Sequence, residues 1–346
     1  MHPAVLFEKK SEYSVKCTAC RWYCSIPNGK TGVCGIRENK NGSLYLKTYA
    51  KPVAINVDPI EKKPLFHFLP GTDIFSLGTL GCNFACEFCQ NWDISQAVRK
   101  HHQENPAKTP SDLFDIGHHW PPEKIVDCCV ENQIPSIAFT YNEPGIFFEY
   151  AFDTMKLGKT HGLKHVFVSN GYTSSEALQK MGNDLNAINI DLKSYSEKFY
   201  QKNCHAQLEP VLSCIEEIAK SNTWLEITTL VIPGENDSSN ELAQIAEFIA
   251  SQNPLIPWHV SAFHPDYHMD HVPATPRKTL ETAFEIGKKA GLEFVYIGNM
   301  ESKAQNTVCP HCQTILIQRK GFNISENQLL GDRCPKCDQT IPGIWN

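Results

Sequence analysis

The sequence predicts an α/β fold in which parallel strands and helices form an open or closed barrel, with cysteine-rich additions at both ends. Between residues 73 and 299, short β-branched or aromatic runs alternate with longer segments of helical periodicity, which is typical of repeated βα units. Groups of four cysteines lie before and after this region. The 346 residues, 41 % of them hydrophobic, allow one large domain with additions or two domains.

The sequence predicts six or seven short strands. They cover residues 73–79, 136–141, 165–170, 187–192, 225–232, 258–263 and 294–299. The clearest helix has Thr275 as its N-cap, Pro276 in its first turn and Gly291 as its stop, and residues 239–252 form a second one. A doubly wound sheet would require a glycine-rich phosphate turn after its first strand, and Gly78 and Gly81 do not make one.

These patterns divide the chain into three predicted domains. We expect a cysteine-rich module over residues 1–65, the barrel over 66–303 and a ribbon with four cysteines over 304–346.

Composition excludes several classes of partner. The formal net charge is −6, without a long run of lysine or arginine, so we expect no nucleic-acid partner. No stretch of about 18 uncharged apolar residues could span a bilayer, and the N-terminal residues lack a signal-peptide core. We therefore expect a cytoplasmic protein with no membrane partner.

Cysteine content points to metal. The chain has 15 cysteines, and a reducing cytosol disfavours a disulfide framework. Eleven of them fall into three groups: Cys17, Cys20, Cys24 and Cys34; Cys82, Cys86 and Cys89; and Cys309, Cys312, Cys334 and Cys337.

The middle group has only three members, in the pattern C-x3-C-x2-C. Structural zinc sites and ordinary iron–sulfur clusters use four protein ligands. Either a distant residue completes a zinc site, or one coordination position stays open for a small molecule.

Polar residues follow several of the expected strands. Asn142 and Glu143 follow the second strand, Ser169 and Asn170 end the third, Asp191 and Lys193 follow the fourth, and His264 follows the sixth. In α/β barrels the C-terminal strand ends form the active-site face. The three-cysteine group follows the first strand, so we expect it on that same face.

At this point the residues resemble the radical S-adenosylmethionine (SAM) superfamily, whose motif C-x3-C-x-aromatic-C is met by Cys82, Cys86, Phe88 and Cys89. The segments "DPIEKKPLFHFLPGT", "FTYNEPGIFFEY", "NIDLKSYSEKFY" and "LVIPGEND" resemble more closely the radical SAM protein of the AmmeMemoRadiSam system, a relative of pyruvate formate-lyase-activating enzyme. The resemblance implies a partial (β/α)6-type barrel, a 4Fe-4S cluster, SAM, and an electron donor such as flavodoxin or ferredoxin.

The resemblance also implies SAM-binding residues, although the family pattern is altered. Activating enzymes carry Gly-Gly-Glu where this chain has Tyr141-Asn142-Glu143, and Asp-Thr-Asn-Gly where it has Val168-Ser169-Asn170-Gly171. The expected cofactor-binding set is Phe88, Asn142, Glu143, Ser169, Asn170, Asp191 and Lys193. The catalytic candidates are Lys193, Cys204 and His264.

Structural roles remain open for these residues. Glu143 could instead cap the following helix, Asn170-Gly171 could be an ordinary turn, and Asp191 with Lys193 could be a salt bridge at the barrel rim.

The terminal groups have different spacings. Cys309-x2-Cys312 and Cys334-x2-Cys337 predict a zinc ribbon, with rubredoxin-like iron as the alternative. The N-terminal spacing C-x2-C-x3-C-x9-C fits either zinc or a second 4Fe-4S cluster that relays electrons.

The sequence therefore favours an enzyme that cleaves SAM reductively and uses the 5′-deoxyadenosyl radical to abstract hydrogen from a second substrate. That substrate is a protein, as for a glycyl-radical enzyme activase, or a small molecule, and a partner from the same system is a further candidate. The alternative of another class is a zinc-rich interaction scaffold with a non-catalytic barrel.

Overall fold

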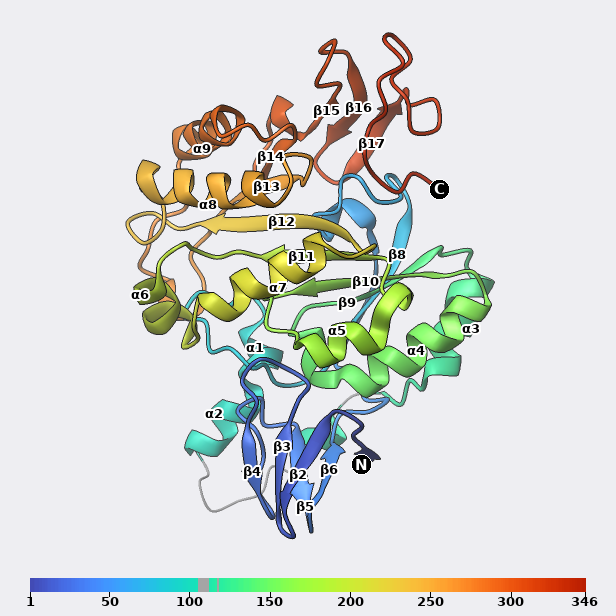
Figure 1. Cartoon of the computed structure of the whole chain (residues 1–346), viewed down its shortest axis with the longest axis vertical. Coiled ribbons are helices and arrows are strands. Elements are labelled where there is room, and N and C mark those ends of the chain that lie inside the picture. The colour runs from blue at the N-terminus through green and yellow to red at the C-terminus, as the bar shows by residue number, and fades with distance from the viewer. Residues whose placement is uncertain (105–111, 117) are drawn as a thin grey trace. The chain divides into compact units, whose positions relative to one another are not determined.

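The computed structural model describes residues 1–104, 112–116 and 118–346. The chain forms two compact units. Unit 1 contains Met1–Val57 and Ile74–Asn186, and unit 2 contains Asp58–Asp73 and Ala187–Asn346. Figure 1 shows the course of the chain from blue to red. The predicted limits of the three domains are not tested by this division and remain a prediction.

Unit 1 begins with two small antiparallel sheets. One has the order β1-β6-β5 and the other β2-β3-β4. Their strands are β1 (His2–Pro3), β2 (Phe7–Ser11), β3 (Ser14–Cys17), β4 (Ser25–Pro27), β5 (Arg37–Lys40) and β6 (Ser43–Leu46). Arg37 is buried and donates two hydrogen bonds to the Glu149 carboxylate, at 2.7 and 2.8 Å. This ion pair holds the N-terminal strands on the helical part of unit 1.

The rest of unit 1 is a succession of strands and helices. Strands β8 (Asp73–Gly78), β9 (Ser136–Phe139) and β10 (Lys164–Ser169) run parallel, with Ile74 opposite Ser136 and Lys164 opposite Ser136 in the register. The other elements are β7 (Ala54–Pro59, at the unit boundary), α1 (Trp92–Ser95), α2 (Ala97–Glu104), η2 (Asp112–Asp115), α3 (Pro122–Glu131), η3 (Pro144–Phe147), α4 (Phe148–Thr160), α5 (Ser175–Met181) and η4 (Gly182–Asp184).

Unit 2 contains four parallel strands in the order β11-β12-β13-β14. These are β11 (Ala187–Asp191), β12 (Trp224–Val231), β13 (Trp258–Ala262) and β14 (Val295–Gly298). Helices α8 (Ser239–Gln252) and α9 (Arg277–Lys289) pack against each other beside them (Figure 1). The remaining elements are η1 (Ile60–Lys62), α6 (Glu197–Phe199), the π-helix η5 (Tyr200–Cys204), α7 (Glu209–Ala219), η6 (Tyr267–Met269), η7 (Lys303–Gln305) and the antiparallel strands β15 (Thr307–Val308), β16 (Ile315–Lys320) and β17 (Asn323–Asn327).

The predicted α/β class and its mostly parallel strands are confirmed, because all seven expected strands are present. Helix α8 has the predicted limits. The predicted N-cap of α9 is wrong, because Pro276 caps this helix. Thr275 is buried one residue earlier, where its hydroxyl donates to the carbonyl oxygen of Val231 (2.5 Å) and accepts from the backbone N–H of Phe263 (2.8 Å).

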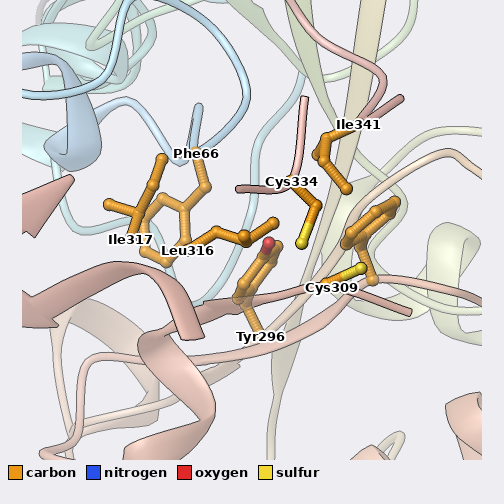
Figure 2. Close-up of a cluster of buried hydrophobic side chains, with 8 residues drawn as sticks. Phe66, Tyr296, Cys309, Leu316, Ile317, Cys334 and Ile341 are labelled. Atoms are coloured by element: carbon orange, nitrogen blue, oxygen red, sulfur yellow. The ribbon is translucent and has the colours of Figure 1, made fainter. Parts of the chain in front are cut away.

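The C-terminal ribbon joins the core of unit 2 through a buried cluster. Figure 2 shows the side chains of this cluster, which comes from four segments of unit 2. Its members are Phe66, Phe294, Tyr296, Cys309, Leu316, Ile317, Cys334 and Ile341. Two cysteines of the ribbon therefore face apolar side chains of the parallel-strand region.

A buried carboxylate organises the polar groups beside this cluster. Glu226 accepts from the backbone N–H groups of Phe66 (3.0 Å) and His67 (2.8 Å). It also accepts from Trp224 Nε1 (3.0 Å) and contacts His259 Nε2 at 2.6 Å. His67 contacts the Pro342 carbonyl oxygen at 2.7 Å through Nδ1. Burial lowers the pKa of His67 to about 4, so this imidazole is neutral at neutral pH. Among the described residues, no helix has the length and apolar character needed to cross a membrane.

Candidate metal centres and strand-end site

The loop that carries the three-cysteine group leaves β8 through two glycines that the fold requires. A Cβ atom added to Gly78 would lie 2.6 Å from the carbonyl oxygen of Thr140, and one added to Gly81 would lie 2.6 Å from that of Cys34. Gly81 also has φ = +85°, where L side chains are strained. The start of the loop is therefore in backbone contact with two other segments of unit 1.

Asn142 fixes the same turn from the end of β9. Its Oδ1 accepts from the backbone N–H of Thr79 (3.1 Å), and its Nδ2 donates to the carbonyl oxygen of Gly81 (2.8 Å). Asn142 thus positions the cysteine loop. Its predicted contact with a cofactor stays a prediction.

The three thiols lie at the boundary between interior and solvent. Cys86 is buried, whereas Cys82 and Cys89 are half-buried. The Cys82 sulfur accepts from the backbone N–H of Phe84 at 3.5 Å, and Cys89 Sγ lies 3.1 Å from the Ser95 hydroxyl. Burial raises the pKa of the Cys82 thiol, so a bound metal would be needed to hold it as a thiolate at neutral pH.

Phe88, the aromatic residue of the motif, is buried beside these cysteines. N–H and O–H groups directed at sulfur are typical of iron–sulfur sites, where hydrogen bonds to sulfur set the reduction potential. Three thiols with such neighbours fit the ligand set of a cluster.

Glu143 is a buried carboxylate whose two oxygens both face hydrogen-bond donors of unit 1. Oε1 accepts from the backbone N–H of Gly145 (3.0 Å), and Oε2 accepts from that of Asn170 (2.8 Å). The Ser169 hydroxyl lies 3.0 Å from both oxygens, and the Thr173 hydroxyl lies 3.4 Å from Oε1. Burial raises the pKa of Glu143 to about 7 against the opposing effect of these hydrogen bonds.

These contacts bring three predicted residues, Glu143, Ser169 and Asn170, together in one place. The contact with Gly145 makes Glu143 the N-cap of η3, which was the structural alternative for this residue. Capping and ligand binding are compatible, since a carboxylate has about four lone-pair sites. The SAM contact of Glu143 remains a prediction.

Asn170 connects this strand end to the cysteine loop. Its Nδ2 donates to Asn83 Oδ1 at 2.8 Å, and its Oδ1 accepts from the backbone N–H of Tyr172 at 3.1 Å. Asn83 directly follows Cys82. The strand-end residues and the three-cysteine loop therefore form one hydrogen-bonded site within unit 1.

The remaining candidates lie in unit 2. Lys193 Nζ donates to Asp191 Oδ2 at 2.8 Å, which is the predicted rim salt bridge. Cys204 ends the π-helix η5 and is fully buried, and His264 is exposed. A buried thiol offers no contact to a substrate in this conformation. The SAM and catalytic roles of these four residues stay predictions.

The C-terminal cysteines form a compact metal-ligand group. The sulfur atoms of Cys309, Cys312, Cys334 and Cys337 all lie within 4.8 Å of one another. Cys309 and Cys337 are 3.6 Å apart, and Cys312 and Cys334 are 3.5 Å apart. Hydrogen bonding with Thr314 lowers the pKa of Cys312 to about 6, which favours a thiolate. Four such sulfurs fit a tetrahedral ion such as zinc.

The N-terminal cysteines also come together, but less tightly. Cys17, Cys20 and Cys34 are buried, and Cys24 is half-buried. Burial, and then the charges of Cys17 and Cys34, raise the pKa of Cys20, so these thiols are neighbours. Within the described parts of the chain, however, only the C-terminal quartet meets the mutual spacing of 4.8 Å.

Some residues of the site carry no signal in the sequence. Asn83, Gly145, Thr173 and Ser95 are ordinary residue types for loops and helix starts. Asn83 is the exception among these four residues, because its position inside the cysteine motif, next to Cys82, could have indicated a role in the site.

Unit 1 thus places a three-cysteine loop beside a polar strand end, and a family comparison identifies this part of the chain. Residues 77–249 match the Radical SAM superfamily, and this match covers the three-cysteine loop, Glu143 and Asn170. The chain belongs to the radical SAM superfamily. SAM and a 4Fe-4S cluster are the cofactors that this membership implies.

Two relatives are similar to the chain over different shares of its length. The chain is 39 % identical over 345 residues to the uncharacterized protein MJ0808 of Methanocaldococcus jannaschii, covering 99 % of each chain. It is 26 % identical over 203 residues to MJ1632 of the same organism, named provisionally as a glycyl-radical enzyme activating enzyme, covering 56 % of this chain and 68 % of the relative.

Two solved structures match part of the chain, and the first of them is similar in fold. Streptococcus suis SuiB bound to S-adenosylmethionine is 10 % identical with a TM-score of 0.50, covering 69 % of this chain and 53 % of SuiB. A domain of pyruvate-formate lyase-activating enzyme from Bacteroides vulgatus is 21 % identical with a TM-score of 0.42, covering 47 % of this chain and 98 % of the domain.

Proposed function

We propose that this protein is a radical SAM enzyme that cleaves S-adenosylmethionine reductively and directs the resulting 5′-deoxyadenosyl radical at a hydrogen atom of a second substrate. Cys82, Cys86 and Cys89 would hold a 4Fe-4S cluster. When bound, that cluster supplies the electron for cleavage and an open iron that chelates the methionine part of SAM. The proposal is carried by one observation, the direct link between the cysteine loop and the polar strand end through Asn83 and Asn170 (2.8 Å).

The residues around this link have distinct proposed tasks. Asn142 holds the turn before Cys82, and Glu143 orders the backbone from Ser169 to Gly171. The Glu143 carboxylate would also attract the ammonium group of SAM, while Asn170 would donate to its carboxylate. We further propose that the parallel strands form the partial (β/α)6-type barrel expected from the sequence.

The two terminal cysteine groups have separate proposed roles. The C-terminal quartet would bind zinc, which would tie the ribbon to the buried cluster shown in Figure 2. A structural zinc ion supplies folding free energy to a small segment with little core of its own.

The substrate is proposed at the level of class. The motifs support placement with the radical SAM protein of the AmmeMemoRadiSam system, which favours a protein or small-molecule substrate within that system. The likeness to MJ1632 favours the second candidate, a glycyl-radical enzyme activase. A reducing compartment, the cytoplasm, suits a chain with 15 cysteines.

Electron paramagnetic resonance (EPR) of the reduced protein tests the SAM-binding step. After anaerobic reconstitution with iron and sulfide, the signal of the reduced cluster should change when SAM is added. Cys86→Ala should remove the SAM-sensitive signal, and Cys214→Ala, a buried cysteine outside the three groups, should keep it. A wild-type EPR spectrum that does not change when SAM is added would contradict the proposal and favour the zinc-rich scaffold.

A further inference from the structure

One cysteine of the N-terminal group and one of the three-cysteine group line the same cavity of unit 1. Its volume is about 260 Å³, and Cys34 and Cys82 both line it. Val98 and Arg99 of α2 line it as well. One ligand of each cysteine group therefore borders a single small space.

From this arrangement we infer that Cys17, Cys20, Cys24 and Cys34 hold a second iron–sulfur cluster, through which electrons reach the three-cysteine site. The inference deepens the proposed function and rests on it. The sequence left zinc and iron–sulfur equally compatible with the cysteine spacing. The surroundings of the four thiols favour iron–sulfur.

The backbones of the two groups touch. A Cβ atom on Gly81 would lie 2.6 Å from the carbonyl oxygen of Cys34 and 2.8 Å from the side chain of Ile36. Gly81 directly precedes Cys82. The backbone of Cys34, a ligand of the N-terminal group, is therefore in contact with the residue next to Cys82, a ligand of the other group. Such closeness suits electron transfer, because its rate falls steeply with distance.

Aromatic rings also connect the two groups. Trp22 lies between the second and third N-terminal cysteines in sequence, and its ring lies 5.5 Å from that of Tyr172. Tyr172 lies 4.8 Å from Phe84, which is inside the three-cysteine loop. Tyr172 and Phe84 are buried, so this part of the contact between the groups consists of packed aromatic rings.

The N-terminal group is anchored to the strand-end site. Cys20 pairs with Thr173 in a β-bridge, the backbone N–H of Arg21 donates to Tyr172 (2.8 Å), and Trp22 Nε1 donates to the carbonyl oxygen of Asn83 (3.0 Å). A zinc ion that only stabilised the N-terminal strands would need none of these contacts. They fix the distance between the two cysteine groups.

The spacing of the thiols separates the two terminal quartets. The C-terminal sulfurs have gathered to within 4.8 Å, which suits a single ion. Within the described parts of the chain the N-terminal sulfurs do not gather to that spacing, so they do not form the same preformed site for a single ion.

The relay is balanced in electrons. A reduced one-electron carrier protein, such as a flavodoxin or ferredoxin, gives one electron to the N-terminal cluster and is itself oxidised by one electron. The N-terminal cluster then passes this electron to the three-cysteine cluster and returns to its oxidised state. No bond is formed or broken in either step.

Metal analysis of a variant without the three-cysteine site tests the inference. In the triple variant Cys82→Ala, Cys86→Ala, Cys89→Ala, anaerobic reconstitution should leave about half of the wild-type iron, with an EPR signal after reduction. The companion variant Cys24→Ser should instead lose the iron of the N-terminal group and keep the iron of the three-cysteine group. Iron-free triple-variant protein with two zinc ions per chain would overturn the inference.

Two measurements on intact wild-type protein keep the test decisive if a variant fails to fold. The iron content should be about eight atoms per chain, corresponding to two 4Fe-4S clusters, whereas zinc at the N-terminal group would give about four. In the fully reduced protein, magnetic coupling between close clusters should broaden the EPR signal. These readouts do not depend on SAM cleavage, so they distinguish failure of the relay from failure of the proposed enzyme activity.

Discussion

Replacing Gly81 by alanine tests the contact between the two cysteine segments. Gly81 has φ = +85°, and its added Cβ atom would lie 2.6 Å from the backbone oxygen of Cys34. Gly162 is a matched control, because its φ is +76° and an added Cβ atom would have no neighbour within 4 Å. Both substitutions cause backbone strain, but only Gly81→Ala causes a collision with backbone.

The two effects have different expected magnitudes. Alanine in the left-handed region costs about 1–2 kcal/mol, so Gly162→Ala should lower the free energy of unfolding by that amount. The collision at Gly81 should add about 1–3 kcal/mol, since the Cys34 carbonyl cannot rotate away like a side chain. At about 2–4 °C per kcal/mol, Gly81→Ala should melt about 2–12 °C below Gly162→Ala.

The assay is calorimetry of both variants at equal metal loading, together with iron analysis after reconstitution. Gly81→Ala should also retain less iron than Gly162→Ala, because the shifted backbone carries Cys34 and Cys82. Equal melting temperatures for the two variants would refute the backbone contact and with it the fixed spacing of the cysteine groups.

Three further predictions concern other parts of the chain. Cys334→Ser should release one zinc ion per chain and make residues 304–346 sensitive to protease. The control Cys214→Ser, at a buried cysteine outside the quartet, should retain the zinc. Zinc retained by Cys334→Ser would contradict the metal site. Burial lowers the pKa of His67 to about 4, so as pH falls the unfolded chain takes up this proton near pH 6.5 and the folded chain only near pH 4. His67 should therefore lower the free energy of unfolding by about 3 kcal/mol between these two pH values. His67→Asn should flatten this dependence in denaturation curves at several pH values, and an unchanged slope would refute the assignment. Glu143→Gln would direct an amide N–H at a backbone N–H, so it should lower the free energy of unfolding by about 1–3 kcal/mol and SAM affinity at least tenfold; a fully stable variant with normal affinity in a binding titration would exclude both roles.

The strands of the parallel region were predictable because their signal is local. The run "WHVSAF" is buried along its whole length and "LEITTLVI" along most of it, so β-branched and aromatic residues mark these strands directly. The start of α9 was misplaced by one residue for a non-local reason. Thr275 has the residue type of an N-cap, but its hydroxyl is bonded to Val231, 44 positions away in the sequence.

The N-terminal strands were not resolved as separate elements by the sequence. Strands β1 to β6 have two to five residues each and mostly mixed burial, so hydrophobic periodicity has too few positions to act on. Their arrangement depends on distant partners such as the ion pair between Arg37 and Glu149, which no local pattern reveals.

The candidate site was predictable in its ligands but not in its connections. Cysteine spacing identified Cys82, Cys86 and Cys89, and strand ends identified Glu143 and Asn170. Two partners of Glu143 are backbone N–H groups, whose direction depends on the folded loop rather than on residue type. For the same reason, the approach of Cys34 to Gly81 could only be found in the structure.

Release of 5′-deoxyadenosine tests the central claim most directly. The reconstituted, reduced wild-type protein should convert SAM to 5′-deoxyadenosine and methionine in a one-to-one ratio, measured by chromatography with mass detection. Cys86→Ala should abolish this product, while Cys214→Ala should form it at the wild-type rate. Absence of 5′-deoxyadenosine from wild-type protein with a full complement of iron, or equal amounts from Cys86→Ala, would contradict the account.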